Sequence, residues 1–123
     1  MAENQLVILS RAFAVDIINL CENLRERKKA TAIINQLLRS GTSIGANIHE
    51  ANYASSKADF INKFQIALKE CYETDYWLGL FKDTNMITVD EYNGLFSQCS
   101  KIRKLLIASI TTAKSTRNKS ETF

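Results

Sequence analysis

The stretch Gln36-Leu37-Leu38-Arg39-Ser40-Gly41-Thr42-Ser43-Ile44-Gly45-Ala46-Asn47-Ile48-His49-Glu50 decides how this chain folds. Read as a helix at 100° per residue, five of its polar side chains fall on one narrow stripe; they are Gln36, Arg39, Ser43, Asn47 and Glu50. The opposite side is apolar and includes two glycines one turn apart, Gly41 and Gly45. We expect this helix to make contacts on both sides, because amide and hydroxyl groups form defined hydrogen bonds and glycines admit a close neighbour.

The rest of the sequence has the same helical period. It contains no proline and only four glycines, which favours long helices joined by short links. Apolar spacings of three and four residues predict helices over about residues 4–24, 31–53 and 57–83, and a fourth that begins near residue 88. Ser55, Ser56 and Asp59 predict the start of the third helix, and Thr88 with Glu91 forms a capping box for the fourth.

Four amphipathic helices with short links specify an all-α fold, an antiparallel up-down four-helix bundle. We expect residues 1–113 to form this bundle and residues 114–123 to be a polar, frayed C-terminal tail.

The third predicted helix is apolar in more than one direction. Its main seam runs from Phe60 to Leu78, and two flanking stripes contain Ile66, Trp77 and Leu80 on one side and Ile61, Leu68 and Tyr72 on the other. A small monomer does not bury three stripes of one helix. The pattern therefore favours a homo-oligomer over a chain whose apolar residues are all buried in its own core.

The charge is weakly basic and unevenly distributed. Sixteen lysines and arginines stand against 13 acidic residues, a net charge of +3. The basic groups gather near residues 25–29 and in the fourth helix, and the candidates for nucleic-acid contact are Arg25, Arg27, Lys28, Lys29, Lys101, Arg103 and Lys104. Such contacts would be directed at the phosphate backbone and sensitive to salt. In the alternative interpretation, these charges only solvate the surface.

Compartment signals are few. Cys21, Cys71 and Cys99 are an odd number of widely spaced cysteines, which favours reduced buried thiols over a disulfide framework or a zinc site. The N-terminus lacks the basic start and cleavage site of a signal peptide. Arg11 and Asp16 interrupt the longest apolar run, so we expect no membrane span and a cytoplasmic protein.

Catalytic and metal sites need side chains that this sequence lacks. A di-iron bundle requires two Glu-x-x-His pairs, but His49 is the chain's single histidine, and we expect it to be a packing residue. Glu70 and Glu73, beside Trp77, are either an acid/base pair or the partners of a cation, with Arg39 as the candidate. We favour the ion pair and expect neither catalysis nor a cofactor nor a metal.

Several segments together resemble a known family. They are Gln36-Leu-Leu-Arg39-Ser40, Ser43-Ile44, Asn47-Ile48-His49-Glu50, Lys57-Ala58-Asp59-Phe60, Ala67-Leu68-Lys69-Glu70 and Glu73-Thr74-Asp75-Tyr76-Trp77-Leu78. They are similar to the bacterial four-helix-bundle proteins called the 23S rRNA intervening-sequence or S23 family. The resemblance implies a ring-like homopentamer. It also implies a relation to the accessory variability proteins of diversity-generating retroelements, basic pentamers that engage a reverse transcriptase and its RNA.

These observations predict a non-enzymatic, oligomeric binding or scaffold protein that contacts structured RNA or an RNA-handling protein. The polar stripe Gln36, Arg39, Ser43, Asn47 and Glu50, with Glu70, Glu73 and Trp77, would form a network that fixes the register of the assembly. Two alternatives stay open. One is a module that binds only proteins, and the other is a small hydrolase that uses Glu70 and Glu73 in a deep pocket beside Trp77.

Overall fold

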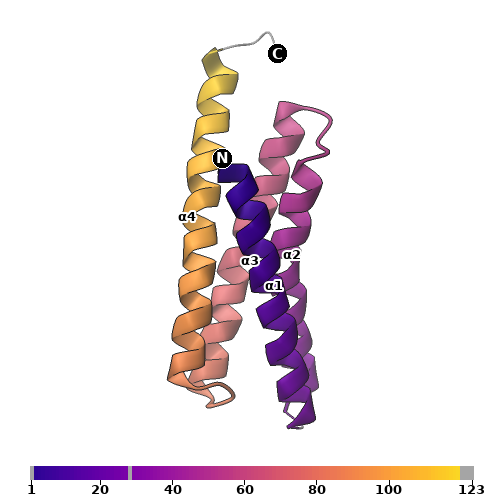
Figure 1. Ribbon diagram of the computed structural model, residues 1–123, viewed down its shortest axis with the longest axis vertical. Coiled ribbons are helices and arrows are strands. Elements are labelled where there is room, and N and C mark those ends of the chain that lie inside the picture. Colours follow the sequence, from indigo (N-terminus) through magenta and orange to yellow (C-terminus); the bar gives the residue numbers. More distant parts are fainter. Residues whose placement is uncertain (1, 28, 120–123) are drawn as a thin grey trace.

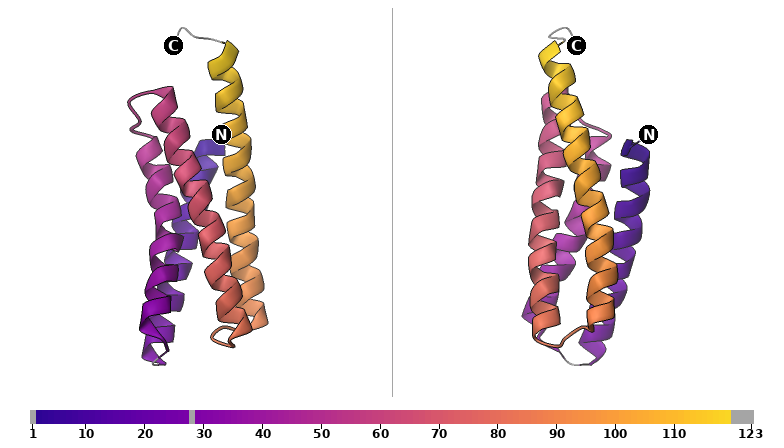
Figure 2. Two further views of the ribbon diagram at one scale, coloured as in Figure 1. Left: turned by 180° about the vertical axis from the view of Figure 1, so that it is seen from behind. Right: turned by 90° about the vertical axis from the view of Figure 1, so that its left-hand side faces the viewer.

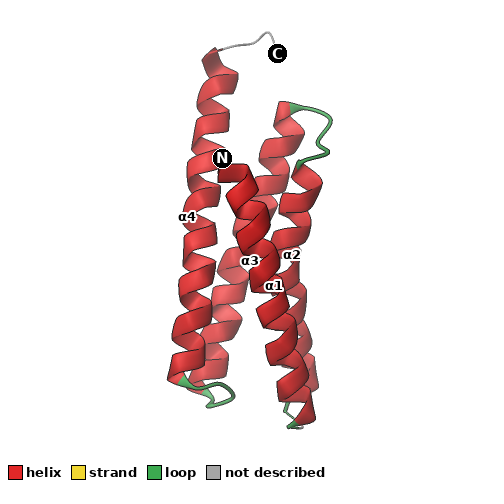
Figure 3. Ribbon diagram, viewed as in Figure 1, coloured by secondary structure: helices red, strands yellow, loops and turns green. Residues whose placement is uncertain are grey.

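The computed structural model describes residues 2–27 and 29–119, and its side chains over 4–27 and 29–116. Its elements are four helices, α1 (Ala2–Glu26), α2 (Thr31–Ala51), α3 (Lys57–Asp83) and α4 (Val89–Lys119). They run up and down along one long axis, as Figure 1 shows. The described links are short and lie at the two ends of the bundle (Figure 3). The predicted antiparallel four-helix bundle is confirmed.

The predicted helix starts are also confirmed at α3 and α4. At α3, Ser56 Oγ accepts a hydrogen bond from the Asp59 N–H at 3.0 Å. At α4, Thr88 Oγ1 accepts from the Glu91 N–H at 3.0 Å, and a Glu91 carboxylate oxygen accepts from the Thr88 N–H at 2.8 Å. These bonds satisfy backbone donors that no helical carbonyl reaches.

Each helix packs against two neighbours, in the ring order α1, α2, α3, α4. The core between them is apolar and includes the large, fully buried side chains Phe13, Phe64 and Phe81. Helices α1 and α2 approach closely at both glycines: a Cβ at Gly41 would lie 3.0 Å from both Cγ atoms of Ile17, and one at Gly45 would lie 3.4 Å from the Ser10 carbonyl oxygen. The glycines of the deciding stretch thus bring α1 onto α2.

The fourth helix is longer than expected. It continues to Lys119, so residues 114–119 are helical rather than a frayed tail, and residues 120–123 lie outside the described part of the chain. Figures 1 and 2 show that this end of α4 stands beyond the other three helices. Polar composition alone does not end a helix, and neither glycine nor proline, the two strongest helix breakers, occurs in residues 114–119.

The two flanking stripes of α3 have different fates. In one flank, Ile61 is buried in the chain's own core and Leu68 packs against that core, whereas Tyr72 of the same flank is not buried. Ile66, Tyr72 and Tyr76 remain exposed on the outer surface of α3. The outer surface of α1 also exposes apolar side chains, Ile8 and Val15.

Within the described ranges, one helical segment, Asn4–Glu26, is long and apolar enough to cross a membrane by length and composition, with a mean hydropathy of 1.3. Length and hydropathy are weak evidence here, because a core helix of a bundle passes the same test. One side of this helix is buried against α2 and α4 through residues such as Leu6, Phe13 and Ile17.

Candidate interaction site on helices α2 and α3

Helices α2 and α3 form an antiparallel hairpin with its turn near residue 56. Polar side chains at similar distances before and after this turn contact each other. Thr74 Oγ1 donates a hydrogen bond to Ser40 Oγ at 3.0 Å in the buried interior. Closer to the turn, Lys63 Nζ lies 3.0 Å from a Glu50 carboxylate oxygen. Residues equally distant from the turn oppose one another, and this register brings polar side chains 13 to 34 residues apart into contact.

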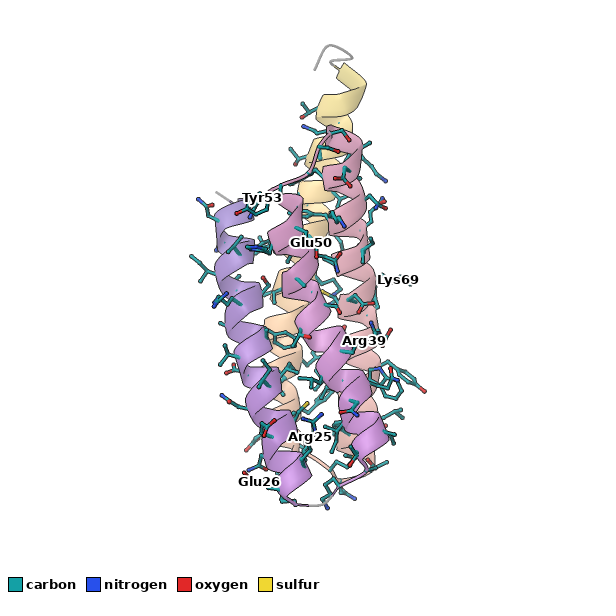
Figure 4. The ribbon with its side chains drawn as sticks, turned by 90° about the vertical axis from the view of Figure 1, so that its right-hand side faces the viewer. Arg25, Glu26, Arg39, Glu50, Tyr53 and Lys69 are labelled. Atoms are coloured by element: carbon teal, nitrogen blue, oxygen red, sulfur yellow. The ribbon has the colours of Figure 1, made fainter. Side chains whose placement is uncertain are left out.

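The centre of the site is a network of one guanidinium, two carboxylates and an indole. Arg39 Nη1 lies 3.0 Å from Glu70 Oε2, and Arg39 Nη2 donates to Glu73 Oε2. The same Glu73 oxygen accepts a hydrogen bond from Trp77 Nε1 at 3.1 Å. The expected pairing of Arg39 with Glu70 and Glu73 therefore exists, but it joins α2 to α3 within one chain. Figure 4 shows Arg39 on α2 beside α3.

Burial differs sharply within this network. The Glu70 side chain is only 11% exposed, whereas the Arg39 side chain is 51% exposed. The hydrogen bonds from Trp77 and Arg39 lower the pKa of Glu73, and the hydrogen bond to Glu73 raises that of Arg39. The network thus contains a buried carboxylate, that of Glu70, and a guanidinium, that of Arg39, which still reaches solvent.

The other members of the predicted stripe do not join this network. Ser43 Oγ donates to the Arg39 carbonyl at 2.7 Å, and Asn47 Nδ2 donates to the Ser43 carbonyl at 2.9 Å. Both side chains therefore bond to their own helix, as short polar side chains often do. Gln36 is exposed, and Glu50 pairs with Lys63 instead of joining Arg39.

A second polar cluster lies between α3 and α4. Burial raises the pKa of Asp75, while the neighbouring Cys99 thiol and the charge of Arg103 oppose that shift. Among the described side chains, Asp75 Oδ1 and Arg103 Nε are buried without a hydrogen-bond partner. The pKa of Cys99 is raised by its hydrogen bond with Cys71 and by burial. All three cysteines are buried free thiols, as predicted, and burial raises the pKa of Cys21 to about 11.

The two carboxylates with shifted pKa values predict opposite responses to acid. Glu73 has a lowered pKa, so its contribution to stability is present above its unfolded-state pKa and is lost as pH falls through the folded-state pKa. Asp75 has a raised pKa, so its contribution is present at low pH and is lost as pH rises through the folded-state pKa. On acidification from about pH 7 to about pH 3, we expect Glu73→Gln to lose less stability than wild type and Asp75→Asn to lose more. Urea unfolding at several pH values measures this, and two variants that both follow the wild-type curve would contradict it.

The predicted nucleic-acid contacts separate into free and engaged cations. Arg27, Lys29, Lys101 and Lys104 are exposed, whereas Lys28 lies outside the described residues. Arg25 is engaged by Glu22 at 3.4 Å and by Asn35. The prediction that Arg103 is a free surface cation is wrong. Its guanidinium lies 5.7 Å from the centre of the Tyr72 ring and donates to Ser100 Oγ at 2.9 Å.

The free cations do not form one patch on a single chain. Arg27 and Lys29 lie at the link between α1 and α2, at the end of the bundle where α4 begins (Figure 1). Lys101 lies about 18 Å along α4 from that end, at 1.5 Å per residue. Two small basic patches are therefore presented, one at the end and one on the side of the bundle.

Among the described residues, the fold does not bring further candidate catalytic or metal-binding side chains together. Glu70 and Glu73 are both bonded to Arg39, and neither lines the grooves of about 480, 330 and 340 Å³ on the bundle. In the described part of the chain, no three His, Cys, Asp or Glu side chains gather as a metal would require. His49 is exposed rather than packed in the core, with its ring centre 5.5 Å from that of Tyr53.

Comparison with known proteins supports the same architecture. Residues 2–108 match the family described as 23S rRNA-intervening sequence protein. The chain belongs to this family. It is similar to a crystallised protein of unknown function from the S23 ribosomal protein family of Bacteroides thetaiotaomicron VPI-5482. That protein is 49% identical, with a TM-score of 0.88 over 90% of this chain and 99% of that chain. No curated protein matches significantly.

The family match ends at residue 108, so the last part of α4 in this S23-family chain lies outside it. The interpretation of the sequence also missed contacts inside the match, notably Lys63 with Glu50 and Arg103 with Tyr72. The Lys63–Glu50 pair has a usable signal, because both residues are nearly equidistant from the α2–α3 turn. Arg103 carries no such signal, since a basic residue on an amphipathic helix usually faces solvent.

Proposed function

We propose that this S23-family chain is a non-catalytic binding module that acts in the cytoplasm as an assembly of several copies. We further propose that it contacts structured RNA, or a protein that handles RNA, through its free cations. The main support for an assembly is the outer surface of α3, where the aromatic side chains of Tyr76 and Tyr72 are 60% and 51% exposed. Tyrosine and tryptophan are enriched at the centres of protein interfaces, because they bury much area at little entropic cost.

The surroundings of these aromatic residues favour an ordered interface. The Tyr76 ring packs edge-on against Trp77 at 5.2 Å, and Trp77 is fixed by its hydrogen bond to Glu73. Gly79 follows on the same helix, and a Cβ there would meet nothing within 4 Å. A rigid aromatic pair beside open space is a surface that a second copy can approach. A ring of five copies, as the family resemblance implies, is the assembly we propose.

Sedimentation tests the assembly. We expect wild type to sediment as a multiple of the 13.9 kDa chain and Tyr76→Glu to shift toward the mass of a single chain. A charge placed in an apolar interface is strongly unfavourable when it is desolvated. Val89→Glu is the matched control, because Val89 is equally exposed but lies at the start of α4. Wild type at the mass of one chain would refute the assembly.

Filter binding of a structured RNA hairpin over a salt series tests the nucleic-acid contact. We expect affinity to fall as salt rises and to weaken in two double variants, Arg27→Gln/Lys29→Gln and Lys101→Gln/Lys104→Gln. Lys69→Gln is the control, because Lys69 is an exposed cation on the outer edge of α3 (Figure 4). Binding weaker than micromolar with no salt dependence would favour the alternative, a module that binds only proteins.

A further inference from the structure

We propose that the groove between α1 and α2 is a nucleotide site that takes one phosphorylated, base-bearing unit. The groove has a volume of about 330 Å³, within the range of small-molecule sites. Its lining is Val7, Ser10, Arg11, Ala14, Thr42, Gly45, Ala46, His49 and Glu50. No residue of the Arg39 network lines it, so it is separate from the site on α2 and α3.

The charge in the groove favours an anion. Arg11 is exposed, and none of the ion pairs among the described side chains involves it. The one carboxylate of the lining, Glu50, is paired with Lys63 of α3 at 3.0 Å. The groove therefore keeps an uncompensated guanidinium, and guanidinium groups bind phosphate through two parallel hydrogen bonds.

Two aromatic side chains at the groove favour a flat ligand, because His49 lines the groove and Tyr53 packs against His49. The rings of His49 and Tyr53 lie 5.5 Å apart with an angle of 55° between them, and Tyr53 is 78% exposed. Figure 4 places Tyr53 and Glu50 at the end of α2 that lies beside the start of α1. Bases of single-stranded nucleic acids stack on such exposed rings, whatever their sequence.

The floor of the groove offers the remaining contacts of a nucleotide. Val7, Ala14 and Ala46 supply an apolar surface. The hydroxyl of Thr42 donates to the Leu38 carbonyl at 2.8 Å, which leaves its oxygen as an acceptor. A ribose hydroxyl or a base amino group donates to such an acceptor, so a nucleotide is the ligand class that matches the guanidinium, the rings and the hydroxyl together.

Two sources carry this chemistry, a free mononucleotide and a nucleotide within an RNA strand. The strand form rests on the RNA contact proposed above, whereas the free form does not. Calorimetric titration with adenosine monophosphate, with adenosine and with an adenylate pentanucleotide distinguishes them. Variants Arg11→Gln and Tyr53→Ala are compared with controls at exposed positions outside the groove and outside the surfaces proposed for RNA and assembly, Lys114→Gln and Val89→Ala.

We expect adenosine monophosphate or the pentanucleotide to bind wild type and to lose about tenfold or more in affinity in each groove variant. Arg11→Gln should leave adenosine binding unchanged, because adenosine has no phosphate, while Tyr53→Ala should weaken it. Monophosphate binding that persists when hairpin binding fails supports the site and refutes only the RNA contact. No saturable binding of either phosphorylated probe, or equal binding by wild type and both groove variants, would overturn the proposal. Melting curves that match wild type show that the variants fold.

Discussion

Replacing Gly41 by valine is expected to lower the free energy of unfolding by about 3 kcal/mol. A Cβ at this position lies 3.0 Å from Cγ1 and Cγ2 of Ile17, tighter than normal packing allows. Ile17 is fully buried and β-branched, so it has few alternative rotamers with which to move aside. The two further methyl groups of valine enlarge the clash, and α1 must shift away from α2.

Gly94→Val is the matched control for this substitution. Gly94 is also inside a long helix, but a Cβ there meets nothing within 4 Å. The change in helix propensity is the same at both positions, so the difference between the variants isolates the helix contact. Urea unfolding followed by circular dichroism measures it. Equal stabilities for the two variants would contradict the close approach of α1 and α2 at Gly41.

Replacing Arg39 by alanine is expected to lower the free energy of unfolding by about 2 kcal/mol. The substitution removes both ion pairs of the network and leaves the Glu70 carboxylate buried without its charged partner. An orphaned buried charge costs more than the pair contributed. The same variant should weaken any assembly that uses this surface, which sedimentation reads independently of unfolding.

Two comparisons separate burial from charge in this effect. Lys63→Ala also breaks an α2–α3 ion pair, but the Glu50 side chain is 57% exposed, so we expect a clearly smaller loss of stability than in Arg39→Ala. In the double variant Arg39→Ala/Glu70→Gln, part of the lost stability should return, because no buried charge remains. An Arg39→Ala loss no larger than that of Lys63→Ala would show that burial of Glu70 is unimportant.

Much of the fold follows from local sequence. Helix periods, the absence of proline and the caps at Ser56 and Thr88 act over a few residues, so they predict the helices and their starts. The predicted end of α4 is wrong. Residues 114–119 are polar but contain neither glycine nor proline, and the helix continues to Lys119. The pairing of Arg39 with Glu70 and Glu73 was predictable, since unusual polar residues on neighbouring helices need partners.

The sites depend more on geometry than on composition. The ring contact of His49 with Tyr53 is local, between residues four apart, but Arg11 lines the same groove as His49 only because of how α1 lies against α2. Arg103 was expected at the surface, but the rotation of α4 turns it onto Tyr72. One residue of helical rotation is 100°, so a periodic pattern that defines a broad apolar side does not decide the position of a residue at its edge.

The sequence by itself determined the helices, their caps, the family and the existence of a polar stripe from Gln36 to Glu50 within an otherwise apolar bundle. Only the tertiary structure decided which members of that stripe reach another helix. Arg39 and Glu50 contact α3, whereas Ser43 and Asn47 bond to their own backbone. The reason is physical: hydrogen bonds within a helix span four residues and are encoded locally, but contacts between helices depend on register and rotation, which the packing of the whole core sets.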